Sequence, residues 1–107
     1  MKKILVIEDE TEVRDNIAEI LQLSDYDVLK AADGRSGVDL ALKELPDMII
    51  CDIAMPGGLD GYGVLLALQR GAPTASIPFI FLTALTEKEQ IRKAMTAGAD
   101  DYLTKPF

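Results

Sequence analysis

The segment Asp47-Met48-Ile49-Ile50-Cys51-Asp52 is apolar between two carboxylates, and it decides the fold. A similar segment near the amino terminus, Ile4-Leu5-Val6-Ile7-Glu8, also runs into an acidic group. Short runs in which nearly every residue is apolar are typical of strands that are buried on both faces of a parallel sheet. The two segments therefore predict two inner strands of such a sheet, each followed by or ending at a carboxylate.

Helical and strand patterns alternate along the rest of the chain. Three further strands are predicted over residues 27–31, 78–83 and 101–104, with a helix between each strand and the next. Asp33, Asp60 and the capping box Thr86-Glu87-Lys88-Glu89 indicate where three helices begin, because such side chains bond the free amides of a first helical turn. The apolar faces of the four helices are expected to consist of Val13, Ile17, Ile20 and Leu21; Val38, Ala41, Leu42 and Leu45; Val64, Leu65 and Leu68; and Ile91, Ala94 and Met95.

This alternation predicts an α/β fold, a doubly wound parallel sheet of five strands with helices on both faces. A length of 107 residues fits one domain over residues 1–107. A fifth helix should follow the last strand and share one face of the sheet with the first helix. Without it that face would carry an exposed apolar patch, so either the domain is truncated before its last helix, which we favour, or something else covers the patch.

Charge and composition narrow the classes of function. The net charge is −7, from 11 basic and 18 acidic residues, and a surface of this sign repels nucleic acid and anionic membranes. No apolar run is long enough to span a bilayer, and the single cysteine, Cys51, fits a reducing compartment, so a cytoplasmic location is expected. Because the chain has no histidine, a metal site would use oxygen ligands, which favours magnesium, manganese or calcium.

Polar side chains stand where the predicted strands end. Glu8 and Asp9 follow the first strand, Asp52 ends the third, Thr83 ends the fourth and Lys105 follows the fifth. Because ligands bind beyond the carboxyl ends of the strands in open parallel sheets, we expect these groups to form one site. Each of them has an ordinary explanation when taken singly, such as a solvated loop or a surface lysine, but their coincidence at one edge indicates function.

The chemistry of this set points to phosphoryl transfer. Neighbouring carboxylates repel one another, and magnesium binds through one or two carboxylates together with water and phosphate oxygens, so Asp9 and Asp52 are placed to bind it. Lys105 can then hold a phosphoryl oxygen as a mobile positive charge, and the Thr83 hydroxyl can donate a hydrogen bond to another. These residues predict that Asp52 is a nucleophile that forms an aspartyl phosphate.

The site residues belong to longer motifs, which are Ile4-Leu5-Val6-Ile7-Glu8-Asp9-Glu10, Cys51-Asp52-Ile53-Ala54-Met55-Pro56, Asp60-Gly61, Leu82-Thr83-Ala84 and Gly98-Ala99-Asp100-Asp101-Tyr102-Leu103-Thr104-Lys105-Pro106-Phe107. In this order the motifs resemble the receiver domains of two-component response regulators, and the resemblance covers the whole chain. It implies a flavodoxin-like sheet with the strand order 2-1-3-4-5.

The resemblance also implies that Asp52 is the phosphoacceptor and that the donor is a phosphohistidine of a sensor histidine kinase or a phosphotransfer protein. Mg²⁺, or Mn²⁺ in its place, would bind Asp9, Asp52 and the backbone carbonyl of Ala54, and Glu8 would assist through a water molecule. The chain would thus be a signalling phosphoacceptor that assists its own phosphorylation and dephosphorylation, not an enzyme that acts on an external substrate.

The phosphoryl group would be contacted by Thr83, Lys105 and the small residue Ala84. Tyr102 would turn inward as Thr83 moves towards the phosphate, so these two residues would switch the output surface. The bond between Lys105 and Pro106 would be a cis peptide. In this family the face that contains the last helix commonly forms a dimer, so a homodimer is an open expectation for this chain.

One departure from the family pattern lies between Met55-Pro56 and Asp60-Gly61. Three residues, Gly57-Gly58-Leu59, stand where many members have two. The loop is therefore expected to be longer and more mobile, and this affects the surface that a kinase would meet.

Three other classes of protein share part of this pattern. A pseudo-receiver, which only binds proteins, should lack one of Asp9, Asp52, Thr83 or Lys105, and all four are present; it remains the alternative. A phosphatase of the haloacid dehalogenase type should carry a second aspartate where this chain has Ala54. A flavin or nucleotide carrier needs an amide-donating loop after the first strand, where this chain has three acidic residues.

Overall fold

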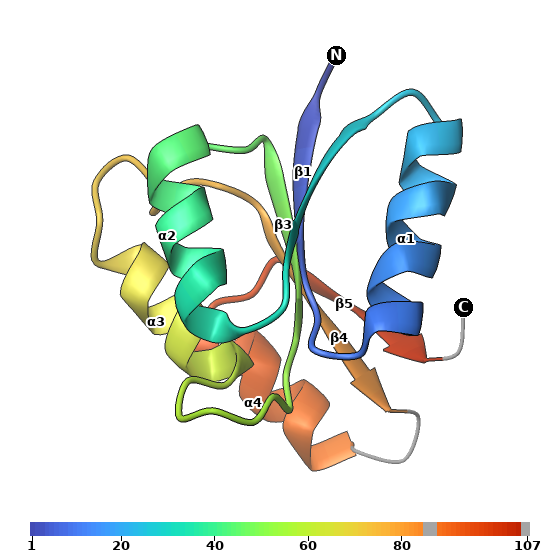
Figure 1. Cartoon of the computed structure of the whole chain (residues 1–107). Coiled ribbons are helices and arrows are strands. Elements are labelled where there is room, and N and C mark those ends of the chain that lie inside the picture. The colour runs from blue at the N-terminus through green and yellow to red at the C-terminus, as the bar shows by residue number, and fades with distance from the viewer. Residues whose placement is uncertain (85–87, 106–107) are drawn as a thin grey trace.

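The computed structural model describes residues 1–84 and 88–105, apart from the side chains of Ala84, Lys88, Gln90, Ile91 and Lys105. Strands and helices alternate along the chain in the predicted order (Figure 1). The strands are β1 (Lys3–Ile7), β2 (Asp27–Ala31), β3 (Met48–Asp52), β4 (Phe79–Ala84) and β5 (Asp101–Lys105), and the helices are α1 (Thr11–Leu23), α2 (Gly34–Glu44), α3 (Gly61–Gln69) and α4 (Lys88–Ala97).

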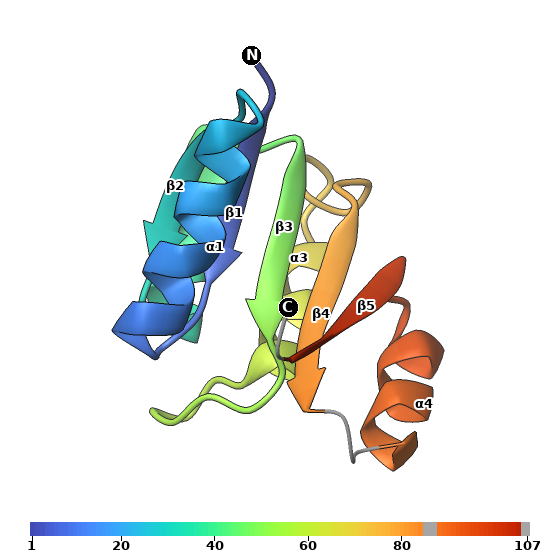
Figure 2. The same ribbon diagram turned by 90° about the vertical axis from the view of Figure 1, so that its right-hand side faces the viewer.

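The five strands lie parallel in one sheet with the order β2-β1-β3-β4-β5 (Figure 2). This confirms the expected flavodoxin-like topology. The two apolar segments that predicted inner strands, β1 and β3, are neighbours inside the sheet and are buried over nearly their whole length. From β1 the chain crosses to β2 on one side and then returns to β3 on the other. The carboxyl ends of β1 and β3 therefore lie at the topological switch point of the sheet.

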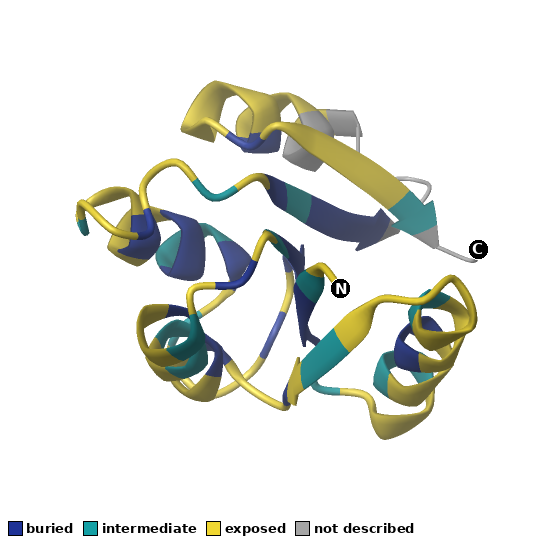
Figure 3. Ribbon diagram, turned by 90° about the horizontal axis from the view of Figure 1, so that it is seen from above, coloured by how far each residue is buried: buried dark blue, intermediate teal, exposed yellow. Residues whose placement is uncertain are grey.

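Helices cover both faces of the sheet, with α1 on one side and α2, α3 and α4 on the other (Figure 1). Alternate residues of β1 enter the two cores: Leu5 and Ile7 join the larger cluster below α2 and α3, whereas Ile4 and Val6 join the smaller cluster below α1. The larger cluster also contains Phe81, whose ring packs 5.0 Å from that of Phe79. Buried positions in Figure 3 concentrate in the inner strands, and β5 is mostly exposed.

Two of the predicted helix caps are confirmed. The Asp33 carboxylate accepts a hydrogen bond from the Ser36 amide at 2.8 Å, and the Asp60 carboxylate accepts one from the Gly63 amide at 2.9 Å. The Ser36 amide, as the largest influence, lowers the pKa of the Asp33 carboxyl below its ordinary value, because the bond favours the charged form. The predicted capping residue Thr86 lies outside the described residues.

The prediction from the sequence was wrong for four apolar side chains that were expected to face the core. Ile20, Leu42, Leu45 and Met95 each expose between 43% and 53% of their surface. In α2 the stripe against the sheet runs through Ala41, and Leu42 is turned about 100° away from it around the helix axis. Leu45 follows the helix in the left-handed conformation, with φ 47°, so it no longer continues the helical face.

An apolar groove of about 260 Å³ opens between α1 and the sheet, on the face where the fifth helix was expected. It is lined by Ile17, Ile20, Leu21, Ile50, Leu82 and Leu103. Among the residues that the structure describes, α1 is the one helix on this face (Figure 1). The four helices thus fit a flavodoxin-like fold without its fifth helix. In the described ranges no helix has the length and apolar character needed to cross a membrane.

Two isoleucines of α1 test this view of the groove. Ile17→Ala is expected to lower the free energy of unfolding by about 2–5 kcal/mol, because it leaves a cavity between α1 and the sheet. Ile20→Ala, the same change one turn away, is expected to cost less than about 1 kcal/mol, because this side chain is already 53% exposed. Urea unfolding followed by circular dichroism measures both values. Equal losses would mean that Ile20 is covered in solution.

Candidate functional site

The sheet brings the predicted site residues to its carboxyl edge. Asp52 is the last residue of β3 and lies opposite Leu82 of β4, so Thr83 is one step further along the neighbouring strand. Thr83 lies opposite Thr104 of β5. Because all these strands are parallel, their last residues point towards the same edge of the sheet. The site therefore spans four adjacent strands, β1, β3, β4 and β5.

Three carboxylates meet at this edge. One oxygen each from Glu8, Asp9 and Asp52 lies within 4.8 Å of the other two. Glu8 is fully buried and Asp52 is 6% exposed, whereas Asp9 is half-buried. A donor set of carboxylate oxygens fits a hard divalent cation such as Mg²⁺ or Mn²⁺, and it gives zinc none of the nitrogen or sulfur ligands that zinc prefers.

The backbone around Glu8 is fixed by three hydrogen bonds. Its amide donates to the Ala31 carbonyl at 3.0 Å, and its carboxylate accepts from the Glu10 amide at 3.1 Å. The Arg14 guanidinium donates to the Glu8 carbonyl at 2.9 Å. Sequence reasoning missed Arg14, although it is a basic side chain in the first turn of the helix that follows the acidic motif. Its positive charge lies next to the segment that carries the carboxylates.

The chain leaves Asp52 in a loop that closes back on it. The Ile53 amide donates to the Leu82 carbonyl at 3.1 Å, which extends the pairing of β3 with β4 by one residue. At the end of the loop the Gly61 amide donates to the Ile53 carbonyl at 2.8 Å. A Cβ atom at Gly61 would collide with the Asp52 carbonyl oxygen, so only glycine allows this approach. The backbone of Asp52 is therefore held from both sides.

The structure describes some of the remaining predicted site residues in full and others by their backbone alone. Thr83 is 2% exposed at the end of β4, and Ala54 lies in the exposed part of the loop after β3. Tyr102 of β5 lies opposite Phe81 of β4 and is 36% exposed. The backbone of Lys105 pairs with that of Ala84 at the carboxyl edge, but the side chains of both lie outside the described residues. The predicted cis bond to Pro106 also lies outside them.

Cys51 is buried among these charges and is not part of the donor set. Its side chain is fully buried, and the thiol donates a hydrogen bond to the Asp52 carbonyl at 3.3 Å. Burial raises the pKa of the Cys51 thiol well above its ordinary value, and the negative charges of Asp52, Glu8 and Asp60 raise it further. The thiol therefore stays protonated, as a small apolar residue of the core would.

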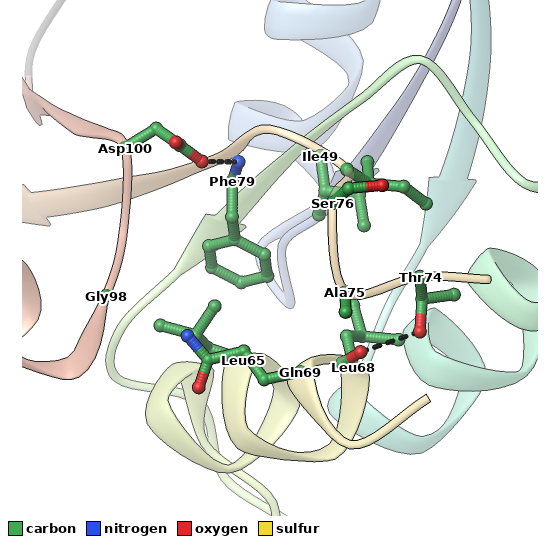
Figure 4. A pocket seen from close by; sticks show the side chains of 11 residues that line it. Ile49, Leu65, Leu68, Gln69, Thr74, Ala75, Ser76, Phe79, Gly98 and Asp100 are labelled. Atoms are coloured by element: carbon green, nitrogen blue, oxygen red, sulfur yellow. Dashed lines mark hydrogen bonds between the residues drawn. The ribbon is translucent and has the colours of Figure 1, made fainter. Parts of the chain in front are cut away.

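A separate cavity of about 140 Å³ lies near the amino end of β4, between the ends of α3 and α4 (Figure 4). Its polar side chains bond the surrounding backbone: Asp100 accepts from the Phe79 amide at 2.8 Å, and the Thr74 hydroxyl donates to the Leu68 carbonyl at 2.7 Å. Among its lining residues is none of those predicted for the site. The cavity lies at the other end of the strands from the acidic cluster, so it is not part of the site.

Comparison with known proteins identifies the class of protein to which this fold and this acidic cluster belong. The chain belongs to the response regulator receiver domain family, whose sequence profile matches residues 4–107. Receiver domains of this kind interact with histidine kinases or phosphotransfer proteins, and the family generally binds Mg²⁺.

The individual relatives are response regulators as well. The chain is 41% identical over 107 residues to the DNA-binding dual master transcriptional regulator RpaA of Synechocystis sp., covering 100% of this chain and 44% of that protein. It is 37% identical over 106 residues to the phosphate regulon transcriptional regulatory protein PhoB of Escherichia coli, covering 99% of this chain and 46% of that protein. The chain thus spans less than half the length of these relatives.

Solved structures show the same fold. The chemotaxis protein CheY4 of Vibrio cholerae superposes with a TM-score of 0.92 at 33% identity, covering 100% of this chain and 88% of that one. A putative response regulator from Chloroflexus aurantiacus superposes with a TM-score of 0.94, also at 33% identity, covering 99% of this chain and 86% of that one.

The buried thiol predicts a pH dependence of stability. The unfolded chain loses the Cys51 proton more readily than the folded protein does. The contribution of the protonated thiol to the free energy of unfolding is therefore complete below the ordinary thiol pKa of 9.0 and is lost as the pH rises past it. Cys51→Ala is expected to be less stable at neutral pH but to lose less stability between about pH 7 and about pH 10. Urea midpoints at both pH values measure the difference. An equal alkaline decline in the two proteins would contradict the buried thiol.

Proposed function

We propose that this chain is a cytoplasmic phosphoacceptor domain, in which Asp52 takes a phosphoryl group from a phosphohistidine of a sensor histidine kinase or a phosphotransfer protein. The observation that carries the proposal is the cluster of Glu8, Asp9 and Asp52, whose oxygens lie within 4.8 Å of one another at the switch point of the sheet. On this view the domain acts in signalling and assists its own phosphorylation and dephosphorylation, with no external substrate to turn over.

Each residue of the acidic cluster would have a separate role in the reaction. Asp9, Asp52 and the Ala54 carbonyl would hold Mg²⁺ or Mn²⁺, with Glu8 acting through a water molecule. When bound, the cation lowers the repulsion between the carboxylates and the incoming phosphoryl oxygens. An Asp52 carboxylate oxygen attacks phosphorus, the phosphorus–nitrogen bond breaks, and its electron pair leaves with the imidazole of the donor.

The ends of β4 and β5, at the same edge of the sheet as Asp52, would stabilise the transferred group. The Thr83 hydroxyl would donate to one phosphoryl oxygen and the Lys105 ammonium would neutralise another, with Ala84 leaving room for the group. Thr83 is 2% exposed and follows Leu82, the residue that lies opposite Asp52. The net charge of −7 argues against direct binding of nucleic acid by this domain.

A phosphorylation assay tests the proposal. Incubation with acetyl phosphate and Mg²⁺ is expected to add the mass of one phosphoryl group, because Asp52 is the nucleophile and a small acyl phosphate can replace the protein donor. Asp52→Asn should abolish the adduct, and chelation of the metal should suppress it. Asp39→Asn, which removes an equal charge from an exposed position of α2, should leave the yield unchanged. Intact-protein mass spectrometry measures all four samples, and no adduct on the unaltered chain would favour the pseudo-receiver alternative.

The switch would act by a shift of population. The phosphoryl group would favour the arrangement in which Thr83 moves towards it and Tyr102 turns inward. The free energy available to drive the switch is therefore the difference between the affinities of the two arrangements for the phosphoryl group. Tyr102 is 36% exposed, which leaves it room to move to a more buried position.

Tyr102→Ala is expected to keep phosphorylation but to reduce the change in backbone chemical shifts that phosphorylation causes in α4, because the residue couples the site to the surface. Tyr26→Ala is a matched control, since Tyr26 is 37% exposed and lies before β2. Nuclear magnetic resonance spectra with and without acetyl phosphate measure the change. A response as large in Tyr102→Ala as in Tyr26→Ala would rule out the aromatic switch.

A further inference from the structure

We propose that Leu59 is a positioning residue of the phosphoacceptor site, because it packs against Gly34 and Gly63 and thereby fixes the path of the loop between Asp52 and α3. This inference rests on the proposed function, since the site that Leu59 positions is the one assigned to Asp52. The loop extends beyond the carboxyl edge of the sheet (Figure 2). Its middle contains the segment Gly57-Gly58-Leu59.

The loop is anchored near both ends and open in the middle. Met55 is 8% exposed within the larger core cluster, and Leu59 is half-buried and packs against the same cluster. Between them Gly57 and Gly58 adopt φ values of 95° and 91°, with no atom within 4 Å of where a side chain would begin. Glycine is the residue that enters this conformation without strain. Gly57 and Gly58 therefore form an exposed arch, and Leu59 returns the chain to the protein.

Leu59 reaches its position because two neighbouring residues have no side chain. A Cβ atom at Gly34 would lie 2.5 Å from the Leu59 carbonyl oxygen and 3.0 Å from its Cβ atom. A Cβ atom at Gly63 would lie 2.5 Å from the Leu59 Cδ1 atom. Gly34 is the first residue of α2 and follows the cap residue Asp33. The contact therefore joins the loop after β3 to the start of α2.

The contact lies a short distance along the chain from Asp52. Two residues after Leu59, the Gly61 amide donates to the Ile53 carbonyl, and the Gly61 backbone packs against the Asp52 carbonyl. The loop is thus a closed segment, with one end on Asp52 and the other held by Leu59 and Gly61. A displaced Leu59 would shift the segment that contains Ala54, whose carbonyl is the third expected ligand of the cation. Groups that orient metal ligands in this way affect metal affinity without touching the metal.

The test compares two leucines of similar burial. Leu59→Ala is expected to weaken Mg²⁺ binding about tenfold, the lower end of the effect of changing groups that orient ligands. Leu29→Ala removes a half-buried leucine of β2 that packs against the same core cluster, so it should lower stability but leave Mg²⁺ affinity unchanged. Leu59→Met, which keeps the volume of the side chain, should restore most of the affinity. Isothermal titration with Mg²⁺ alone measures affinity, and urea unfolding measures stability.

Gly34→Ala provides a variant that keeps Leu59 and disturbs only its contact. Alanine is favoured over glycine within a helix, so α2 should not be weakened by its propensity. The added methyl group would still meet the Leu59 carbonyl oxygen, and Mg²⁺ binding should weaken as in Leu59→Ala. Wild-type Mg²⁺ affinity in both Leu59→Ala and Gly34→Ala would overturn the proposal.

Hydrogen exchange in metal-free protein separates this inference from the proposed function. The Gly61 amide should exchange faster in Leu59→Ala than in Leu29→Ala, after correction for global stability, because Leu59 holds the end of the loop. Equal exchange would overturn the positioning role even if Mg²⁺ binds normally to the unaltered chain. Failure of the unaltered chain to bind Mg²⁺ would instead contradict the proposed function, and the exchange rates would still decide whether Leu59 holds the loop.

Discussion

Repulsion among three carboxylates at the switch point is the constraint around which the carboxyl edge of this protein is arranged. Glu8 and Asp52 are buried or nearly so, and Asp9 lies beside them, so their charges are poorly screened by water. The sheet can hold them together because β1 and β3 are adjacent inner strands, fixed by apolar cores on both faces. A divalent cation is the natural partner of such a cluster, and a phosphoryl group becomes acceptable there only with positive charge nearby.

The loops at this edge hold the backbone of the site in place. Arg14 bonds the Glu8 carbonyl, and Gly61 brings the start of α3 against the Asp52 backbone. The loop after β3 combines an exposed arch with an anchored end at Leu59. The buried thiol of Cys51, which keeps its proton, adds no further negative charge to the cluster.

Much of the fold could be predicted because local patterns and tertiary structure agree. The apolar runs of β1 and β3, and the caps Asp33 and Asp60, each gave the correct element at nearly the correct residue. The prediction failed for Ile20, because an amphipathic pattern does not say how wide a stripe of the helix its neighbours will cover. Ile20 borders the open groove next to α1, where a further helix would be needed to bury it.

The sequence alone determined the class of fold, and it predicted the donor atoms and the candidate site residues, because periodicity and residue chemistry are local properties. It also determined that a metal would meet oxygen ligands, since the chain has no histidine and one cysteine. Only the tertiary structure decided that Glu8 is buried beside Asp52, that Arg14 bonds the Glu8 carbonyl, and that Leu59 packs against glycines of α2 and α3. These contacts join residues far apart in the chain, and their distances depend on strand register and loop path, which no local pattern specifies.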